Sequence, residues 1–116
     1  MKHHVPFITI EEDDDLIVSF GLGPHAAQSL TLLRTPKFES MLPNDERGVT
    51  VSSGDPNAVD RELLISLAWG NQSVLIVSTQ NEYELDIGSV SPDEVMEAKS
   101  VIRKMNFDRR FKVQGA

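Results

Sequence analysis

The segment ELLISLAWGNQSVLIVST, residues 62–79, constrains the fold more than any other part of the chain. Two apolar stretches of strand length, rich in branched side chains, flank the short sequence at residues 69–72. Gly70 and Asn71 in that sequence can adopt positive φ, which tight turns between antiparallel strands often require. We therefore predict a β-hairpin here, and with it a fold based on antiparallel pairing.

Several other segments show strand patterns. Segment 29–38 tolerates a helix as well as a strand, and we predict a strand because Pro36 closes it early and its threonines suit a pleated surface. Segment 41–48 is predicted to be a loop from its proline, asparagine and glycine content. The predicted strands lie within residues 5–10, 16–20, 29–38, 48–57 (ending in a Gly-Asp-Pro turn), 62–79 (the hairpin) and 83–89.

One helix is predicted near the C-terminus. Ser91 can cap it, Pro92 suits the first helical position, and Glu94 would complete a capping box with Ser91. An apolar stripe at spacings of three and four follows, which indicates that one helix face packs on a core. The stripe consists of Val95, Ala98, Val101, Ile102 and Met105.

These elements predict an α+β fold: a mostly antiparallel sheet of about six or seven strands with one C-terminal helix packed on a face. A chain of 116 residues is the usual size of one domain. We predict a single domain at residues 1–116, with its core at about 5–106 and a basic C-terminal tail at 107–116.

The charge of the chain is distributed unevenly. The formal net charge is −7; residues 1–102 carry six basic and seventeen acidic side chains, whereas 103–116 carry five and one. A body this acidic repels nucleic acid and attracts basic partners. The basic residues at the end, with Phe107 and Phe111 among them, are interpreted as complementing the helix dipole, so no nucleic-acid partner is expected.

Several function classes have weak support in the sequence. The chain has no cysteine, which removes disulfides and thiolate chemistry. It shows no signal-peptide pattern and no apolar run near the roughly 20 residues that span a bilayer, so we expect a cytoplasmic protein with no membrane partner. His3 and His4 are interpreted as a mobile tail, and isolated His25 lacks the neighbours that histidine catalysis needs. We therefore expect no enzyme activity.

Two motifs suggest cofactors, but their surroundings disfavour them. The stretch GLGPHA at residues 21–26 matches G-x-G-x-x-A, yet no repeating strand-helix units follow it, so we interpret it as a loop between strands. The acidic run at 11–15 lacks the spacing and turn glycine of a calcium loop. We expect neither a cofactor nor a metal.

The acidic run, EEDDD, is predicted to form the tip of a hairpin between strands 5–10 and 16–20. A solvated tip and a docking patch for a basic partner are both compatible with it. Taking the docking interpretation, we select the most acidic loops and the one tryptophan, which a half-buried core role would also explain. The predicted partner-binding residues are Glu11, Glu12, Asp13, Asp14, Asp15, Asp45, Glu46 and Trp69.

The order of elements resembles a known family. An acidic turn into LIVSF, then LTLLR, NDERGVTV, LLISLAW with SVLIVST, YELDI and the helix PDEVMEAKSVIRKM together resemble the immunity protein 10 family of bacterial polymorphic-toxin systems, over about residues 7–106. The resemblance implies a cytosolic antidote that binds a cognate toxin and blocks its action. It transfers no binding residue to this chain. A regulatory module with a host-cell partner, or a small nucleotide- or metal-binding enzyme, are the alternatives.

Overall fold

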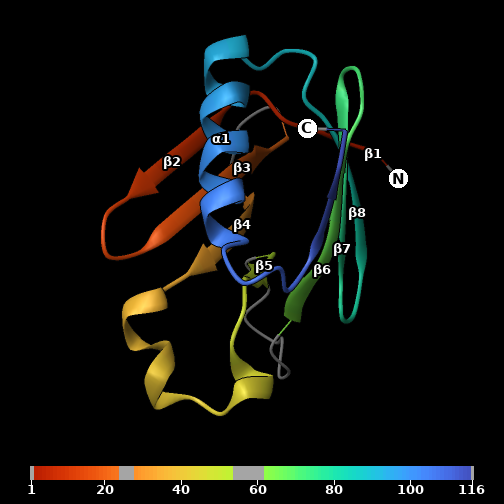
Figure 1. Ribbon diagram of the computed structural model, residues 1–116. Coiled ribbons are helices and arrows are strands. Elements are labelled where there is room, and N and C mark those ends of the chain that lie inside the picture. The colour runs from red at the N-terminus through yellow and green to blue at the C-terminus, as the bar shows by residue number, and fades with distance from the viewer. Residues whose placement is uncertain (1, 24–27, 54–61, 116) are drawn as a thin grey trace.

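The computed structural model of the protein describes residues 2–23, 28–53 and 62–115. Most of its strands pair antiparallel in one sheet, and a single α-helix lies against that sheet (Figure 1). The elements are β1 (Lys2–His4), β2 (Ile8–Glu12), β3 (Leu16–Leu22), β4 (Gln28–Arg34), the 3-10 helices η1 (Pro36–Met41) and η2 (Asn44–Glu46), β5 (Thr50–Ser52), β6 (Glu62–Trp69), β7 (Ser73–Ser78), β8 (Glu82–Asp86), α1 (Pro92–Met105) and β9 (Lys112–Gln114). The predicted α+β class, with a mostly antiparallel sheet and one C-terminal helix, is confirmed, although the described residues form nine strands where about six or seven were predicted.

The sheet bends into two halves that face each other. Strands β2, β3 and β4 form one half and β6, β7 and β8 the other, with short β5 paired to both β4 and β6 (Figure 1). The two ends of the strand order, β1 and β2, follow each other in the chain. The N-terminal segment therefore bridges the halves: β1 pairs with β8, and β2 with β3.

The predicted hairpins are present. Strands β6 and β7 form the one at 62–79, and β2 pairs with β3 around the acidic run. Segment 29–38 is a strand to Arg34, as predicted, and then changes to η1 at Pro36. Gly70 and Asn71 do not use the positive φ that the turn was predicted to need; instead the Gly70 amide donates to the Ser73 carbonyl (2.7 Å). The Gly-Asp-Pro turn lies outside the described residues.

The helix occupies the predicted residues, but its start differs from the prediction. Ser91 is the N-cap residue without a side-chain capping bond, so no capping box forms. The Glu94 carboxylate instead accepts a hydrogen bond from the Ile8 amide at 3.0 Å. This bond joins the helix to the start of β2, which is the last strand in the sheet order and has no further strand among the described residues to pair with the outward-pointing Ile8 amide. The stripe of Ala98, Val101, Ile102 and Met105 is buried in the core, and Val95 packs against its edge.

Both chain ends correct the sequence interpretation. His3 and His4 lie in β1, which pairs in parallel with β8, and are not a free tail. Residues 107–115 are likewise not an appended basic tail: β9 pairs in parallel with β6, and Phe111 belongs to the core at 4% exposure. Neither strand was predicted from the sequence, because three residues are too few to establish a strand pattern and each strand pairs with a segment that is distant in the chain.

Candidate partner-binding surface

The acidic run forms a narrower hairpin tip than predicted. Glu11 and Glu12 extend β2, paired with Ile17 and Leu16 of β3, so only residues 13–15 turn the chain. The Asp13 amide donates to the Asp15 carbonyl at 3.0 Å and closes the turn. Backbone pairing with an apolar strand thus outweighs the weak strand propensity of glutamate.

Contacts with the body of the protein hold part of this tip. Lys104 on α1 forms an ion pair with Glu12, and the Lys37 ammonium lies 3.4 Å from the Asp14 carboxylate. The Thr35 hydroxyl donates to Asp15 at 2.8 Å. The tip is therefore attached to α1 on one side and to the start of η1 on the other, and some of its charge is neutralised.

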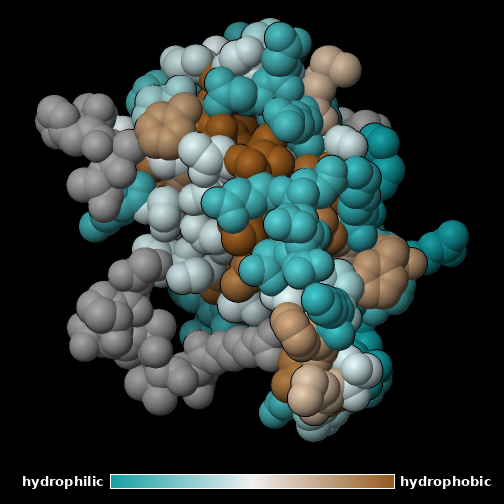
Figure 2. All heavy atoms as spheres, turned by 90° about the vertical axis from the view of Figure 1, so that its left-hand side faces the viewer, coloured by the Kyte–Doolittle hydropathy of each residue, from teal (hydrophilic) through white to brown (hydrophobic). Residues whose placement is uncertain are grey.

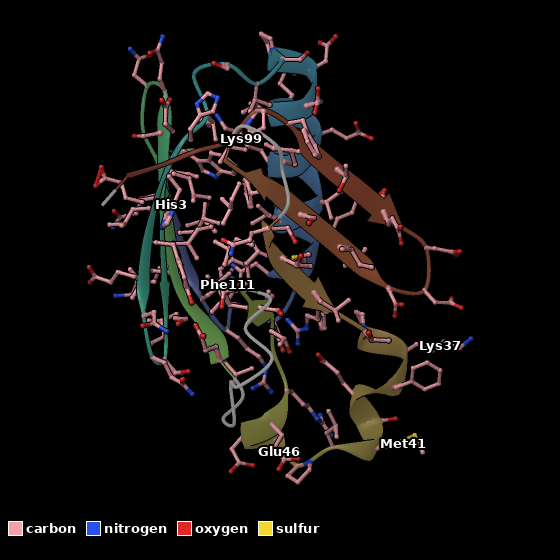
Figure 3. The ribbon with its side chains drawn as sticks, turned by 180° about the vertical axis from the view of Figure 1, so that it is seen from behind. His3, Lys37, Met41, Glu46, Lys99 and Phe111 are labelled. Carbon is pink, nitrogen blue, oxygen red and sulfur yellow. The ribbon has the colours of Figure 1, made fainter. Side chains whose placement is uncertain are left out.

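The segment that follows β4 carries the most exposed apolar side chains near the tip. Phe38 is 54% exposed and Met41 is 80% exposed, and Figure 3 shows Met41 and Lys37 pointing away from the body of the molecule. Beneath η1 lies a cleft of about 360 Å³, lined by Phe38, Met41 and Leu42 among others. The sequence interpretation missed both residues, although two large apolar side chains in a segment between prolines were a usable signal.

Two further acidic residues border this segment. Asp45 and Glu46 lie in η2, immediately after η1, and both are exposed. The Arg110 guanidinium anchors η2 by donating to the carbonyl (2.9 Å) and side-chain oxygen (2.7 Å) of Asn44. We define the η1 surface by six residues: Asp13, Asp14, Phe38, Met41, Asp45 and Glu46.

The face toward which the β2–β3 hairpin tip points is predominantly hydrophilic. Figure 2 shows hydrophilic side chains over much of this face, with apolar side chains visible between them and at its lower end, where η1 projects. Five of the eight predicted binding residues, Glu11 to Asp15, lie in this hairpin, and Asp45 and Glu46 lie in η2 immediately after η1. Trp69 lies elsewhere, at the end of β6 toward the start of α1.

A buried arginine holds η1 in place. The Arg34 side chain is fully buried and forms two hydrogen bonds to Glu39 of η1 (2.8 and 2.9 Å) and two to Asp108 (both 2.8 Å). It also donates to the carbonyl of Met105 at 2.6 Å, which satisfies a backbone acceptor at the end of α1. All five guanidinium hydrogens are used.

The burial of Arg34 could have been predicted from the sequence. Leu30, Leu32 and Arg34 share one face of β4, and the leucines point into the core. A charged residue in an inward position requires buried partners, because an unpaired charge is costly there. The sequence indicates that a partner exists, but Asp108 is too distant along the chain to be identified from it.

The network shifts the pKa of each member. Burial alone would lower the Arg34 pKa, but its bonds to Asp108 and Glu39, with their charges, raise it overall. For Glu39, burial acts to raise the pKa, and the bonds and charge of Arg34 with the Gly48 amide lower it overall. The Asp108 pKa is lowered well below its usual range, first by the hydrogen bond from Arg34, which outweighs burial.

Acidification is expected to weaken the fold through these two carboxylates. Their ordinary pKa values are 4.5 for Glu39 and 3.8 for Asp108, and both are lower in the folded protein. As pH falls, the unfolded chain therefore binds protons first, so this stability is present above about pH 5 and is lost progressively below it. Urea unfolding followed by circular dichroism across that range measures the effect. An Arg34→Met variant should lose less on acidification, and an equal loss would contradict the assignment.

Trp69 is a core residue. It is 7% exposed, and Lys99 lies over its ring with the ammonium 5.2 Å from the centroid. Its buried indole Nε1 has no hydrogen-bond acceptor among the described residues. This position separates it from the acidic residues with which it was predicted to act.

A second buried carboxylate stabilises the opposite end of β6. Glu62 accepts hydrogen bonds from the hydroxyls of Ser78 (2.6 Å) and Tyr83 (2.8 Å). Burial, together with this bond to Glu62, raises the Tyr83 pKa. The cluster joins β6, β7 and β8, and we assign it a structural role.

Two further findings concern ligands and membranes, and both apply only to residues 2–23, 28–53 and 62–115. No group of three or more histidine, aspartate or glutamate side chains lies close enough to hold a metal ion, and no helix is long and apolar enough to cross a membrane. Gly21 of GLGPHA lies near the end of β3, and Gly23 follows the strand with a positive φ (77°). The rest of that motif, including His25, lies outside the described residues.

Comparison with known proteins finds no matching family, no matching curated protein and no matching solved structure.

Proposed function

We propose that this protein is a non-enzymatic binding protein that docks a basic protein partner on the η1 surface. The observation that carries the proposal is the combination of exposed Phe38 and Met41 with acidic residues on both sides. Aromatic and methionine side chains are enriched at the centres of protein interfaces, where they supply most of the binding energy, while charged residues occupy the rim. The η1 surface has this composition.

The charge of the surface selects the kind of partner. Glu11 and Asp13 on one side of η1 and Asp45 on the other are exposed carboxylates on a chain with a net charge of −7. Such a field accelerates association with a positively charged protein and disfavours nucleic acid. The rim carboxylates would therefore govern the association rate, and Phe38 with Met41 would govern the lifetime of the complex.

We further propose that the partner is a cognate toxin and that the protein acts as an immunity protein in the bacterial cytoplasm. The support is the order of elements, which resembles the immunity protein 10 family, and the charge of the η1 surface. Many toxin domains that act on nucleic acid are basic, because they must bind phosphates. An acidic surface competes for the same cationic groups and can cover the site that uses them.

Co-expression tests the toxin proposal. The protein encoded by the neighbouring upstream reading frame is produced in a bacterial host with and without this chain, and growth is measured. We expect the neighbour alone to arrest growth and the pair to restore it through a complex that copurifies. If the neighbouring protein does not arrest growth, or if this chain does not relieve the arrest, the toxin proposal is contradicted. A regulatory module with another partner would then be favoured.

A charge-reversal pair tests the docking surface. Replacing Asp13 and Asp45 with lysine is expected to slow association by at least about tenfold at low salt, and much less at high salt, where screening already removes steering. Stopped-flow or surface-based association rates measure this. The control reverses Glu82 and Glu84 of β8, which are exposed on the other half of the sheet and change the net charge equally. Equal slowing by both pairs would mean that net charge, and not this surface, sets the rate.

A further inference from the structure

The seam between α1 and β9 contains a cluster of cations that form no ion pair with any acid in the described part of the chain. Lys99, Arg103 and Arg109 line one cleft of about 300 Å³, together with Asn106 and Val113 of β9. None of the described residues that line this cleft carries a carboxylate. Among the described residues, no ion pair joins these three cations to an acid, whereas Arg34, Lys37, Lys104 and Arg110 all have acidic partners.

The sequence around the cluster explains why these charges lack partners. On a helix, side chains three and four residues apart are neighbours. The neighbours of Lys99 at those spacings are Val95, Met96, Ile102 and Arg103, and those of Arg103 toward the C-terminus are Asn106 and Phe107. Lys99 and Arg103 therefore repel each other with no nearby acid on α1 to offset the repulsion. Asp108, the one acid after residue 102, is bound to Arg34 and Arg110.

Hydrogen bonds within the turn after α1 hold Arg109 at this cleft. Asn106 makes two hydrogen bonds to the backbone of Phe111, donating to its carbonyl (3.0 Å) and accepting from its amide (3.3 Å). The Arg109 amide donates to the Asn106 carbonyl at 3.0 Å. Within this turn Arg109 has φ 57°, the one non-glycine residue described with positive φ. Such a conformation is uncommon for arginine and persists only where the surroundings enforce it.

An apolar recess continues from the cationic cleft. It has a volume of about 330 Å³, shares Lys99 with that cleft, and is lined by Trp69, Val95 and Met96 among others. Trp69 also carries a buried Nε1 that has no acceptor among the described residues. In Figure 3, Lys99 lies on α1 at the opposite end of the molecule from Met41, so the recess beside Lys99 is separate from the apolar part of the η1 surface.

We propose that this seam binds a small organic anion. Its carboxylate or phosphate group would lie between Lys99, Arg103 and Arg109, where it would relieve the repulsion among them through charge-assisted hydrogen bonds. Its apolar part would occupy the recess beside Trp69. The proposal does not depend on the function proposed for the η1 surface.

Fluorescence of Trp69 offers a direct test, because it is the one tryptophan of the chain. The probes are hexyl phosphate, hexanoate, neutral hexanol and inorganic phosphate, each titrated into the full-length protein. We expect a saturable fluorescence change with hexyl phosphate or hexanoate, and whichever of the two binds more tightly identifies the anionic group. Hexanol and inorganic phosphate should each bind at least about tenfold more weakly, because each lacks one half of the ligand.

Substitutions of the cations test whether they are responsible for binding the anionic probe. Arg103→Gln and Arg109→Gln should each weaken binding of the tighter probe about tenfold, the effect of losing one charge-assisted bond. The control is Lys112→Gln, which removes an exposed cation of β9 outside the cleft and should change affinity less than about twofold. Circular dichroism verifies that each variant is folded. Absence of any saturable change, equal binding of hexanol, or equal loss in the Lys112 variant would overturn the proposal.

Discussion

Replacing Arg34 with methionine is expected to lower the free energy of unfolding by about 3–5 kcal/mol, because removing one partner of a buried ionic network leaves the others uncompensated. Glu39 would lose both of its bonds from the guanidinium and remain 8% exposed. The Met105 carbonyl at the end of α1 would lose its donor as well. Since Asp108 is partly exposed and keeps its ion pair with Arg110, the lower end of the range is the better estimate. Chemical denaturation at neutral pH measures the change.

Two further variants show whether a buried, unpaired charge causes the loss of stability in Arg34→Met. Arg103→Met makes the same substitution at an exposed helix position and should change stability by less than about 0.5 kcal/mol. The double variant Arg34→Met with Glu39→Leu removes both members of one buried pair and should regain at least about 1 kcal/mol over Arg34→Met alone. If the double variant is less stable than the single one, the cost arises from packing and not from an unpaired carboxylate.

Replacing Phe38 and Met41 together with alanine is expected to weaken binding of the partner by roughly 100-fold or more, since central interface side chains each contribute about 2 kcal/mol or more. The loss should appear mainly as faster dissociation, because these side chains add contact area and not charge. Folding stability should change little, because both side chains are more than half exposed. Dissociation rates of the purified complex, together with growth rescue in cells, provide the measurement.

A matched pair elsewhere on the surface is the control for this variant. Met96 on α1 is 69% exposed and Ile65 on β6 is 48% exposed, so replacing both with alanine removes comparable apolar area. This pair should leave binding unchanged within about twofold. If it weakens binding as much as the Phe38 and Met41 pair, or if neither pair has an effect, the η1 surface is not the centre of the interface.

The two predictions are connected through η1. Glu39 lies on the same short helix as Phe38 and Met41, and its carboxylate accepts a hydrogen bond from the Gly48 amide as well as those from Arg34. A 3-10 helix of this length has weak intrinsic stability. We infer that the Arg34 network keeps the two apolar side chains in position, so Arg34→Met should also weaken partner binding.

Much of the fold could be predicted from local patterns in the chain. The hairpin at 62–79, the strand ending at Arg34, and the helix with its stripe at Ala98, Val101, Ile102 and Met105 each have a signal within a short window. Strands β1 and β9 had no usable signal, since each is only three residues long and its partner strand is far away in the chain. The capping box failed for the same reason, because a distant amide, that of Ile8, bonds to Glu94.

The candidate site likewise has features that the sequence predicts and features that it does not. Exposure of the acidic residues follows from their chemistry, so the sequence by itself determined the polarity of the surface and, through its periodicities, the α+β class. Only the tertiary structure decided that η1 lies between the hairpin tip and η2, that Trp69 lies apart from them, and that Arg34 joins Glu39 to Asp108. The physical reason is that hydrophobic periodicity acts between near neighbours, whereas pairing of buried charges and edge strands depends on which distant residues the folded chain brings into contact.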